Sequence, residues 1–344
     1  MSAVPSSAPS RRRVVLLAPV PAPLGERLAA AGLEVVLREV GPGRAEEAAA
    51  AAADADGLFS LLVHPVGERL FAAAPRLAVV ANCATGVDNV DLAAARRHGV
   101  TVANTPGVLT ADTADFTWAL LLALLRRVVE ADAYVRRGEF RGWALDLLLG
   151  RSLGSLTLGV VGAGAIGQAV LARARAFGMT TLYTSRRRLP EAREAALGAS
   201  WRTLDELVAA ADVVSLHAPL TPETRGLFDA ARLARMRPGA FLVNTARGPL
   251  VDEEALAAAL ASGRLGGAAL DVFEREPEVH AGLLGLPNVV LAPHLGSATA
   301  ETRFRMAELS VAALLAVLVE GRAPDHPVVL PPSGGATPGR AGRT

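Results

Sequence analysis

Short apolar runs alternate with Ala- and Leu-rich stretches over most of the chain, and this alternation predicts strands and helices in turn. In the first third of the chain, the predicted strands are Val14–Ala18, Glu34–Leu37, Gly57–Leu62, Ala78–Cys83 and Thr101–Ala103. A helix is predicted over Asp91–His98, between the last two strands. Strands that alternate with helices in this way are typical of βαβ units, whose strands form a parallel sheet.

A second alternating series begins near residue 157 and ends near residue 292. Its predicted strands are Thr157–Val161, Thr180–Tyr183, Val213–Leu216, Ala240–Asn244, Gly267–Asp271 and Val289–Ala292. A helix between them, Asp252–Ser262, begins at an acidic N-cap and is followed by Gly263, which are common start and stop signals. This series predicts a second parallel sheet.

Two long helical patterns lie outside these series. Asp112–Arg136 is the longest, with Asp112 as its N-cap and Gly138 just after its end. Ala300–Glu320 follows the second series and is long enough to pack back onto the first. The chain is therefore expected to leave its first domain, form a second one and return.

A glycine pattern marks the start of the second series. Gly162, Gly164 and Gly167 form a G-x-G-x-x-G motif directly after an apolar strand and directly before an Ala-rich helix. In such a motif the first glycine allows a tight turn, the second a close approach of pyrophosphate, and the third close packing of helix on strand. The phosphates then lie at the helix N-terminus. We therefore expect a dinucleotide site here, with Ala165 and Ile166 also contributing to it.

These patterns predict an α/β protein with two Rossmann-like doubly wound parallel-sheet domains. The dinucleotide-binding domain, residues 109–295, is expected to be inserted in a discontinuous substrate domain formed by residues 13–108 and 296–331. The Pro-, Gly- and Ser-rich ends, residues 1–12 and 332–344, are predicted to be disordered tails.

The segment after the second strand of this series bears on the choice of cofactor. An NAD site usually places a carboxylate there, about 20 residues past the glycine motif. This chain instead has Ser185 followed by Arg186 and Arg187, and a hydroxyl with Arg favours a 2′-phosphate. We predict that NADP(H) is preferred and that NAD(H) is possible. The alternative is that the Arg run is only a solvated loop.

Polar residues follow three later strands. Arg247 comes after the strand ending at Asn244, Asp271 and Glu276 lie at and beyond the next strand, and His294 follows the last. Ligands of open α/β sheets lie outside the carboxyl ends of the strands, so these residues are expected in one crevice. An Arg can bind a carboxylate, and a His beside a Glu can donate a proton.

Composition narrows the class of function. The 344 residues are 51% hydrophobic and carry a net charge of +1, which gives no electrostatic footprint for nucleic acid or an anionic membrane. The single cysteine, Cys83, excludes an internal disulfide and fits a reducing compartment. The start has no signal-peptide pattern, and the longest apolar run, Trp118–Leu125, is too short to span a bilayer. We expect a cytoplasmic enzyme without a metal site.

Several motifs, taken in order and spacing, resemble the D-isomer-specific 2-hydroxyacid dehydrogenase family. The resemblance covers about residues 14 to 330 and is carried by GVDNVDLAAARRHGVTVANTPGVLTADTAD, GVVGAGAIGQAV, PLTPETRGLF, LVNTARGPLVDEEAL, ALDVFEREP and APHLGSAT. Within the family, DTADFTWALLLALLRRV and SATAETR are most similar to the glyoxylate/hydroxypyruvate reductase branch. In that branch a second Trp often follows Trp143 by four residues, where this chain has Leu147.

The resemblance implies an NAD(P)-dependent dehydrogenase that reduces a small 2-oxo acid to the D-2-hydroxy acid. It implies that His294 is the proton donor, that Glu276 keeps the imidazole protonated, and that Arg247 grips the substrate carboxylate and carbonyl. The backbone amides of Thr85 and Gly86 would also bind the carboxylate. The further cofactor-side positions implied are Thr113, Pro219, Thr245, Ala246, Asp271, His294 and Gly296.

Some alternatives stay open at this stage. A phosphoglycerate dehydrogenase or another D-2-hydroxyacid dehydrogenase is the nearest, and a dinucleotide-sensing corepressor of the same fold belongs to a different class. His217 is expected to be a structural or cofactor-loop residue rather than a second acid–base group. A homodimer is expected, because the helix from Asp112 is apolar almost all round between Trp118 and Leu125 and because this region builds the subunit interface in the family that the chain resembles.

Overall fold

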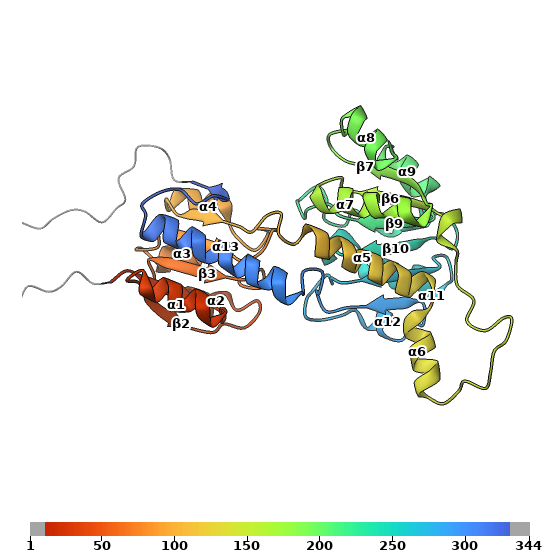
Figure 1. The fold of residues 1–344 in the computed structure, drawn as a ribbon, viewed down its shortest axis with the longest axis horizontal. Coiled ribbons are helices and arrows are strands. Elements are labelled where there is room, and N and C mark those ends of the chain that lie inside the picture. Colours follow the sequence, from red (N-terminus) through yellow and green to blue (C-terminus); the bar gives the residue numbers. More distant parts are fainter. Residues whose placement is uncertain (1–10, 331–344) are drawn as a thin grey trace, which may run out of the picture. The chain divides into compact units, whose positions relative to one another are not determined.

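The computed structural model describes residues 11–330, which form two α/β units (Figure 1). One unit contains the described residues up to Val108 and those from Thr299 onward, and the other is Leu109–Ala298. The return to the first unit comes three residues later than the expected boundary at 295/296, because Asp271 binds the backbone amides of Leu295 and Gly296 and keeps that loop in the central unit. The predicted disordered tails lie outside the described residues, apart from residues 11 and 12.

The discontinuous unit is built around a six-stranded sheet. Its strand order is β13-β5-β4-β3-β1-β2, and β13 is antiparallel whereas the others are parallel. The strands are β1 Arg13–Leu16, β2 Glu34–Leu37, β3 Gly57–Ser60, β4 Val79–Asn82, β5 Thr101–Ala103 and β13 Pro327–Val329. The short, proline-containing β13 was not predicted from the sequence.

Helices cover both faces of this sheet (Figure 1). They are α1 Ala22–Ala30, α2 Ala45–Ala52, α3 Glu68–Ala73, α4 Leu92–Arg97 and α13 Ala300–Leu318. Helix α13 contacts β3, β4 and α1. A Cβ atom at Gly57 would lie 2.7 Å from Leu318 Cδ1, so the glycine allows this helix to approach β3 closely.

The central unit has a seven-stranded parallel sheet in the order β12-β11-β10-β9-β6-β7-β8. Its strands are β6 Thr157–Val161, β7 Thr180–Thr184, β8 Ala199–Trp201, β9 Val213–Leu216, β10 Phe241–Asn244, β11 Gly267–Leu270 and β12 Val289–Leu291. The order reverses between β6 and β9, and ligands of such sheets bind outside the carboxyl ends of the strands at that point. The topology confirms the predicted doubly wound fold.

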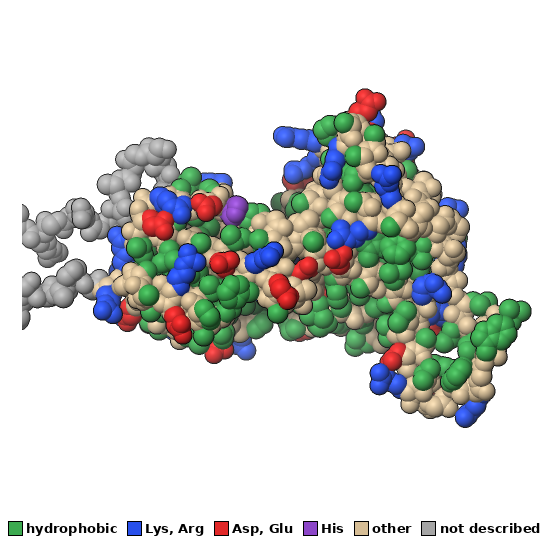
Figure 2. Space-filling view, in the orientation of Figure 1, with side chains coloured by type: hydrophobic (Ala, Val, Ile, Leu, Met, Phe, Trp, Pro, Cys, Tyr) green, Lys and Arg blue, Asp and Glu red, His purple; other side chains and the backbone are tan. Residues whose placement is uncertain are grey.

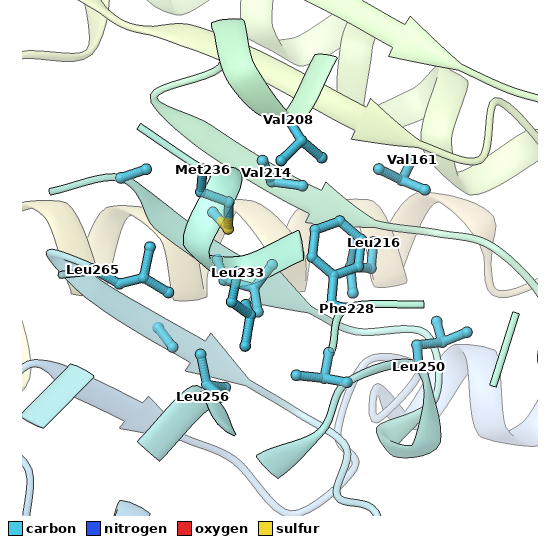
Figure 3. Packing of buried hydrophobic residues seen from close by; sticks show 14 of the residues in the cluster. Val161, Val208, Val214, Leu216, Phe228, Leu233, Met236, Leu250, Leu256 and Leu265 are labelled. Carbon is cyan, nitrogen blue, oxygen red and sulfur yellow. The ribbon is translucent and has the colours of Figure 1, made fainter. Parts of the chain in front are cut away.

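Two buried clusters hold helices against the two faces of the central sheet. The helices of this unit are α5 Thr110–Leu125, α6 Val128–Arg136, α7 Ala165–Ala174, α8 Glu191–Leu197, α9 Leu204–Ala210, α10 Ala230–Arg235, α11 Glu253–Ala261 and α12 Ala281–Leu284. One cluster includes Trp118, Leu121 and Val170 from α5 and α7. The other packs Phe228, Leu233 and Leu256 against the opposite face (Figure 3).

The long helix predicted over Asp112–Arg136 is wrong, because the structure has two helices there. Helix α5 ends at Leu125 and α6 begins at Val128, and Arg127 between them has a φ of 54°. The carbonyl of Leu125 accepts the backbone amide of Arg151 (2.9 Å), and Arg127 instead forms two hydrogen bonds with Glu130. Asp112 lies in the first turn of α5, and Leu109 occupies its N-cap position.

The apolar surface of α5 also has a different explanation from the predicted one. Trp118, Leu120, Leu121, Leu124 and Leu125 are all buried within the central unit, where α5 contacts α7, β10, β11 and β12. A helix packed between another helix and a sheet is apolar on most sides without any partner subunit.

Among residues 11–330, none of the helices combines the length and the hydropathy that are needed to cross a bilayer.

Candidate active site

The turn after β6 lies where the order of the central sheet reverses. Gly162 has a φ of +100°, and a Cβ atom there would lie 2.6 Å from the carbonyl carbon of His217, which follows β9. At Gly167, a Cβ atom would lie 2.0 Å from the carbonyl oxygen of Gly162. Both positions therefore require glycine, because α7 and the end of β9 approach the turn too closely for a side chain.

The middle glycine of the motif differs from the other two. Gly164 is exposed and is the N-cap of α7, and a Cβ atom there would have no heavy atom within 4 Å. No side chain caps this helix, so Ala165 and Ile166 begin α7 at an open N-terminus. A phosphate group fits such a terminus because the first backbone N–H groups and the helix dipole both favour an anion. The residues present therefore fit a dinucleotide pyrophosphate.

The loop after β7 holds the residues predicted to bind the ribose end of the cofactor. Ser185 Oγ donates to the carbonyl of Arg187 (2.6 Å), and Arg186 and Arg187 are exposed. Arg188, in contrast, forms two hydrogen bonds with Glu194 (both 2.8 Å), which also accepts the Tyr183 hydroxyl. The guanidinium of Arg188 holds the pKa of Glu194 down to about 2. The third Arg of the run thus fastens α8 to β7.

Asp271, directly after β11, organises the loop that follows β12. Its side chain is 1% exposed, and its oxygens accept the backbone amides of Leu295 (2.6 Å) and Gly296 (2.8 Å). Its carbonyl accepts the amide of His294 (2.8 Å). Burial raises the pKa of Asp271, and the two amide hydrogen bonds oppose that rise. Three consecutive residues of the loop are therefore attached to one aspartate.

The hydrogen bonds to Asp271 give His294 an unusual backbone conformation and a fixed neighbour. His294 has a φ of 57°, in the left-handed region that few residues with a side chain adopt. Its Nδ1 lies 2.9 Å from Oε2 of Glu276, while Oε1 of Glu276 accepts the amide of Phe273 (3.0 Å). The structure thus brings together the Glu and the His that the sequence placed after neighbouring strands.

Glu276 is negatively charged through the neutral range. Burial acts to raise its pKa, but hydrogen bonding to His294, the charges of His294 and Arg247 and the Phe273 amide together lower it below the usual value. A carboxylate beside a ring nitrogen fixes the ring orientation and favours the protonated imidazole. The second ring nitrogen, Nε2, is then the atom from which His294 can donate a proton.

Arg247 follows β10 in a loop whose backbone is fixed by Asn244 and packed against the loop of Phe273. Asn244 donates to the carbonyl of Arg247 (2.9 Å), and its side-chain oxygen accepts the amide of Ala246 (3.0 Å). At Gly248, a Cβ atom would lie 1.9 Å from the carbonyl carbon of Phe273, so this loop packs directly on the one that carries Glu276. The closeness of the two loops explains why the Arg247 charge acts on Glu276.

Buried threonines connect α5 with the same edge of the sheet. Thr113 lies beside Gly296, where a Cβ atom would be 3.3 Å from Thr113 Cγ2. The hydroxyl of Thr117 donates to the carbonyl of Thr113 (2.7 Å) and lies 2.9 Å from the hydroxyl of Thr245.

Pro219, in the loop after β9, is exposed. Its carbonyl accepts a hydrogen bond from the Thr224 hydroxyl.

His217 has the surroundings of a structural residue. Its backbone amide donates to Val161, and Nε2 lies 2.8 Å from Ser215 Oγ. Burial lowers the pKa of His217 to about 4, so the ring is neutral near pH 7. His217 thus joins β9 to the turn after β6 through its backbone amide and bonds Ser215 through its ring.

Thr85 and Gly86 belong to the discontinuous unit, in the turn after β4. The carbonyl of Thr85 accepts Asn104 Nδ2 (2.7 Å), and that of Gly86 accepts Asn82 Nδ2 (3.0 Å). The carbonyl of the preceding residue, Ala84, accepts a backbone amide (2.9 Å).

These contacts set the direction of the N–H groups in the turn. In a trans peptide the C=O and N–H groups point in opposite directions. Since the carbonyls of Ala84 and Thr85 are held, the N–H groups of Thr85 and Gly86 point away from those partners. Adjacent backbone N–H groups in a turn can bind an anion such as a carboxylate.

Sequence reasoning missed the residues that hold these loops. Asn82, Asn104 and Asn244 each stand at the end of a predicted strand or just after it, and Gly248 follows Arg247 directly. The signal was an amide side chain at a strand end, where it can bind the loop backbone. In residues 11–330, no group of three or more His, Cys, Asp or Glu side chains is arranged to hold a metal ion.

Comparisons with known proteins agree with this geometry. Residues 118–296 match the family model described as "D-isomer specific 2-hydroxyacid dehydrogenase, NAD binding domain". A curated glyoxylate reductase of Thermococcus onnurineus is 50% identical over 267 residues, which cover 76% of this chain and 80% of that protein.

Solved structures show the same architecture. The TT0316 protein of Thermus thermophilus has a TM-score of 0.86 and 48% identity, covering 92% of this chain and 100% of that chain. An NADPH-dependent glyoxylate/hydroxypyruvate reductase of Sinorhizobium meliloti, in complex with NADP and malonate, has a TM-score of 0.80 and 34% identity. That similarity covers 93% of this chain and 97% of the other.

Proposed function

The chain belongs to the D-isomer specific 2-hydroxyacid dehydrogenase family, and we propose that it reduces glyoxylate and similar small 2-oxo acids to D-2-hydroxy acids with NAD(P)H. The observation that carries the proposal is the contact of His294 with Glu276, next to the loop of Arg247 at the carboxyl ends of β10 to β12. The name of the Thermococcus onnurineus relative supports glyoxylate as the substrate.

We propose that His294 protonates the oxygen at C2 of the substrate. A reduced nicotinamide held at this edge would supply the hydride to C2. The carbonyl π pair would then move to oxygen, and that oxygen would take the proton from Nε2 of His294. The products are the 2-hydroxy acid and the oxidised cofactor. Glu276, at 2.9 Å from Nδ1, orients the ring and stabilises its protonated form before the transfer.

Arg247 is proposed to bind the substrate rather than transfer a proton. A guanidinium stays charged at every usable pH and presents a planar fork that matches a carboxylate. The same cation can polarise the C2 carbonyl. The backbone amides of Thr85 and Gly86 are proposed as further carboxylate donors, supported by the carbonyl contacts that fix their direction.

The proposed cofactor site uses the turn after β6 and the neighbouring strand ends. Gly162, Gly164 and Gly167, with Ala165 and Ile166 at the start of α7, would hold the pyrophosphate. Toward the nicotinamide, the proposal includes residues from α5 and the loops after β9 to β12. They are Thr113, Pro219, Thr245, Ala246, Asp271, His294 and Gly296.

NADPH is proposed as the preferred cofactor. Ser185, Arg186 and Arg187 follow β7 where an Asp would accept the ribose hydroxyls in an NAD site. Arg186 is exposed, and its charge helps to lower the pKa of Glu223. The Glu223 carboxylate therefore competes with a phosphate for the Arg186 guanidinium. The relative from Sinorhizobium meliloti was solved with NADP, which supports the same choice.

A homodimer is also proposed, although α5 is buried in its own unit. Apolar side chains gather on the surface of α6 and of the segment after it (Figure 2). Among them, Trp143 is 84% exposed. These residues are Val128, Val129, Val135, Phe140, Trp143, Leu145 and Leu149. A hollow of about 510 Å³ beside them is lined by Val129, Leu149 and Leu286 among others. A large exposed apolar patch next to a hollow is typical of a protein interface.

We also propose that the protein is located in the cytoplasm.

The reaction is tested with a substrate panel on the wild type and on His294→Ala. Glyoxylate, hydroxypyruvate, pyruvate and phenylpyruvate are each assayed with NADPH and with NADH. His294→Ala should lower kcat for reduction by roughly 10²- to 10⁴-fold, because the proton donor is lost. Cofactor affinity should fall far less than kcat, because the glycine turn after β6 would still hold the pyrophosphate. A wild type that turns over none of these acids would leave the corepressor alternative standing.

The pH dependence tests the Glu276 contact separately. Because the Glu276 pKa is lowered, its carboxylate is negative at neutral pH and stabilises the imidazolium beside it. In Glu276→Gln that charge is absent, so the ring loses its proton more readily as pH rises. The alkaline fall of kcat/KM for reduction should therefore move to lower pH. An unchanged pH profile in Glu276→Gln would sink the pairing.

Cofactor preference is tested through kcat/KM with each cofactor. A charge-assisted hydrogen bond of about 1.5–3 kcal/mol corresponds to roughly a 10- to 150-fold preference, and the exposure of Arg186 favours the low end. The double variant Ser185→Asp/Arg186→Ala should shift the preference toward NADH. Its kcat/KM with NADH serves as the internal control and should not collapse. Wild type favouring NADH, or a double variant that does not shift, would overturn this assignment.

The oligomeric state is measured by light scattering at micromolar concentration. The wild type should have twice the mass of the chain, and Trp143→Ser should weaken the dimer because a large apolar side chain leaves the interface. Leu37→Ser is the control, since Leu37 is 47% exposed on β2 of the discontinuous unit and is not part of this patch. A stable wild-type monomer would contradict the proposed dimer.

A further inference from the structure

A buried glutamate at the start of α11 is not used by the chemistry proposed above. Glu253 is the first residue of the helix and is 5% exposed, whereas its neighbour Glu254 is exposed. Both residues are acidic groups in the first turn, so both gain from the helix dipole. Burying a carboxylate costs free energy. The helix dipole does not explain why Glu253 is buried, because Glu254 interacts with the same dipole and stays in water.

The contacts of Glu253 explain its burial. Its Oε1 accepts the backbone amide of Glu274 (2.7 Å). Burial raises the pKa of Glu253, and the backbone groups of Glu274 and His280 oppose the rise. One buried carboxylate thus holds the start of the segment between residues 274 and 280 through the Glu274 amide.

That segment carries Glu276. The amide of Phe273, next to the amide held by Glu253, donates to Oε1 of Glu276 (3.0 Å). The other oxygen of Glu276 lies 2.9 Å from Nδ1 of His294. A continuous set of hydrogen bonds therefore runs from Glu253 through the loop backbone to the imidazole.

We propose that Glu253 is a positioning residue that fixes the loop of Glu276 and thereby the orientation of His294. The inference rests on the proposed role of His294 as proton donor. Glu253 touches neither substrate nor cofactor in this scheme. Its effect on the reaction passes through the Glu274 and Phe273 amides to the Glu276 carboxylate.

The first test compares Glu253→Gln with Glu254→Gln, the same change on the same helix at an exposed position. The Gln side chain offers the Glu274 amide only a neutral acceptor oxygen, which is weaker than the carboxylate, or turns its NH2 group toward that donor. Misplacement of the Glu276 loop should lower kcat for 2-oxo acid reduction by about 10- to 100-fold, with little change in KM for NADPH. The alkaline fall of kcat/KM should move in the same direction as in Glu276→Gln. Glu254→Gln should match the wild type in each measurement.

A double variant separates positioning from general destabilisation. If Glu253 acts through Glu276, then Glu253→Gln should reduce kcat further by less than about 2-fold in a Glu276→Gln background, because neighbouring groups in one network are not additive. Fully multiplicative losses would overturn the proposal. If Glu253→Gln does not fold, Glu253→Asp, which keeps the charge but is one methylene shorter, replaces it with the same expected pattern.

Hydrogen exchange gives a readout that does not depend on turnover. Peptides covering residues 273–280 should exchange faster in Glu253→Gln than in the wild type and in Glu254→Gln, while peptides of β10 and β11 should not. Unchanged exchange in 273–280 would overturn the proposal even for an active enzyme. A wild type that reduces no 2-oxo acid would instead refute the proposed function, and the exchange result would still decide whether Glu253 holds the loop.

Discussion

The buried carboxylate of Asp271 is the contact on which the candidate site depends. Where a strand ends, the backbone groups of the following loop no longer have hydrogen-bond partners in the sheet. Asp271, at the end of β11, supplies such partners to the backbone amides of the loop after β12. Its carbonyl and both side-chain oxygens bind three consecutive amides, from His294 to Gly296. Only with those amides held does His294 keep a left-handed backbone, which turns its side chain toward Glu276.

The other loops of this edge are held by the same means. Asn244 binds the backbone around Arg247, and Glu253 binds the Glu274 amide just before Glu276. In the other unit, Asn82 and Asn104 hold the carbonyls of the turn that contains Thr85 and Gly86. Each proposed active group thus stands on a loop that a buried or half-buried acid or amide fixes from a strand end or helix start, as preorganised sites require.

Much of the fold could be predicted from the sequence because its signals are local. Apolar runs placed β2, β5, β6 and β9 at their observed bounds, and most of the other predicted strands ended within two residues of the observed ones. The glycine motif identified the turn after β6 because its spacing follows from backbone geometry. Family membership then followed from motif order and is confirmed by the comparisons.

The predictions were wrong or incomplete where tertiary contacts determine the end of a helix or the burial of a side chain. At the break between α5 and α6, the backbone amide of Arg151 donates to the Leu125 carbonyl. This contact joins residues 26 positions apart, so no helical pattern in the sequence predicts it. The apolar faces of α5 are covered within its own unit, so the exposed patch lies instead on α6 and the segment around Trp143. Glu253 resembles any first-turn acid in the sequence, and only its burial distinguishes it from Glu254.

The most direct test of this account is kcat for glyoxylate reduction in Asp271→Asn at saturating substrate and cofactor. An Asn amide can accept only one of the two hydrogen bonds and places an NH2 group against the other amide donor, so the turn of His294 should lose its fixed geometry. We predict that kcat falls by about 10-fold or more, since a lost hydrogen bond to a charged group is worth roughly 1.5–3 kcal/mol. A variant with wild-type kcat would show that Asp271 does not hold the site together.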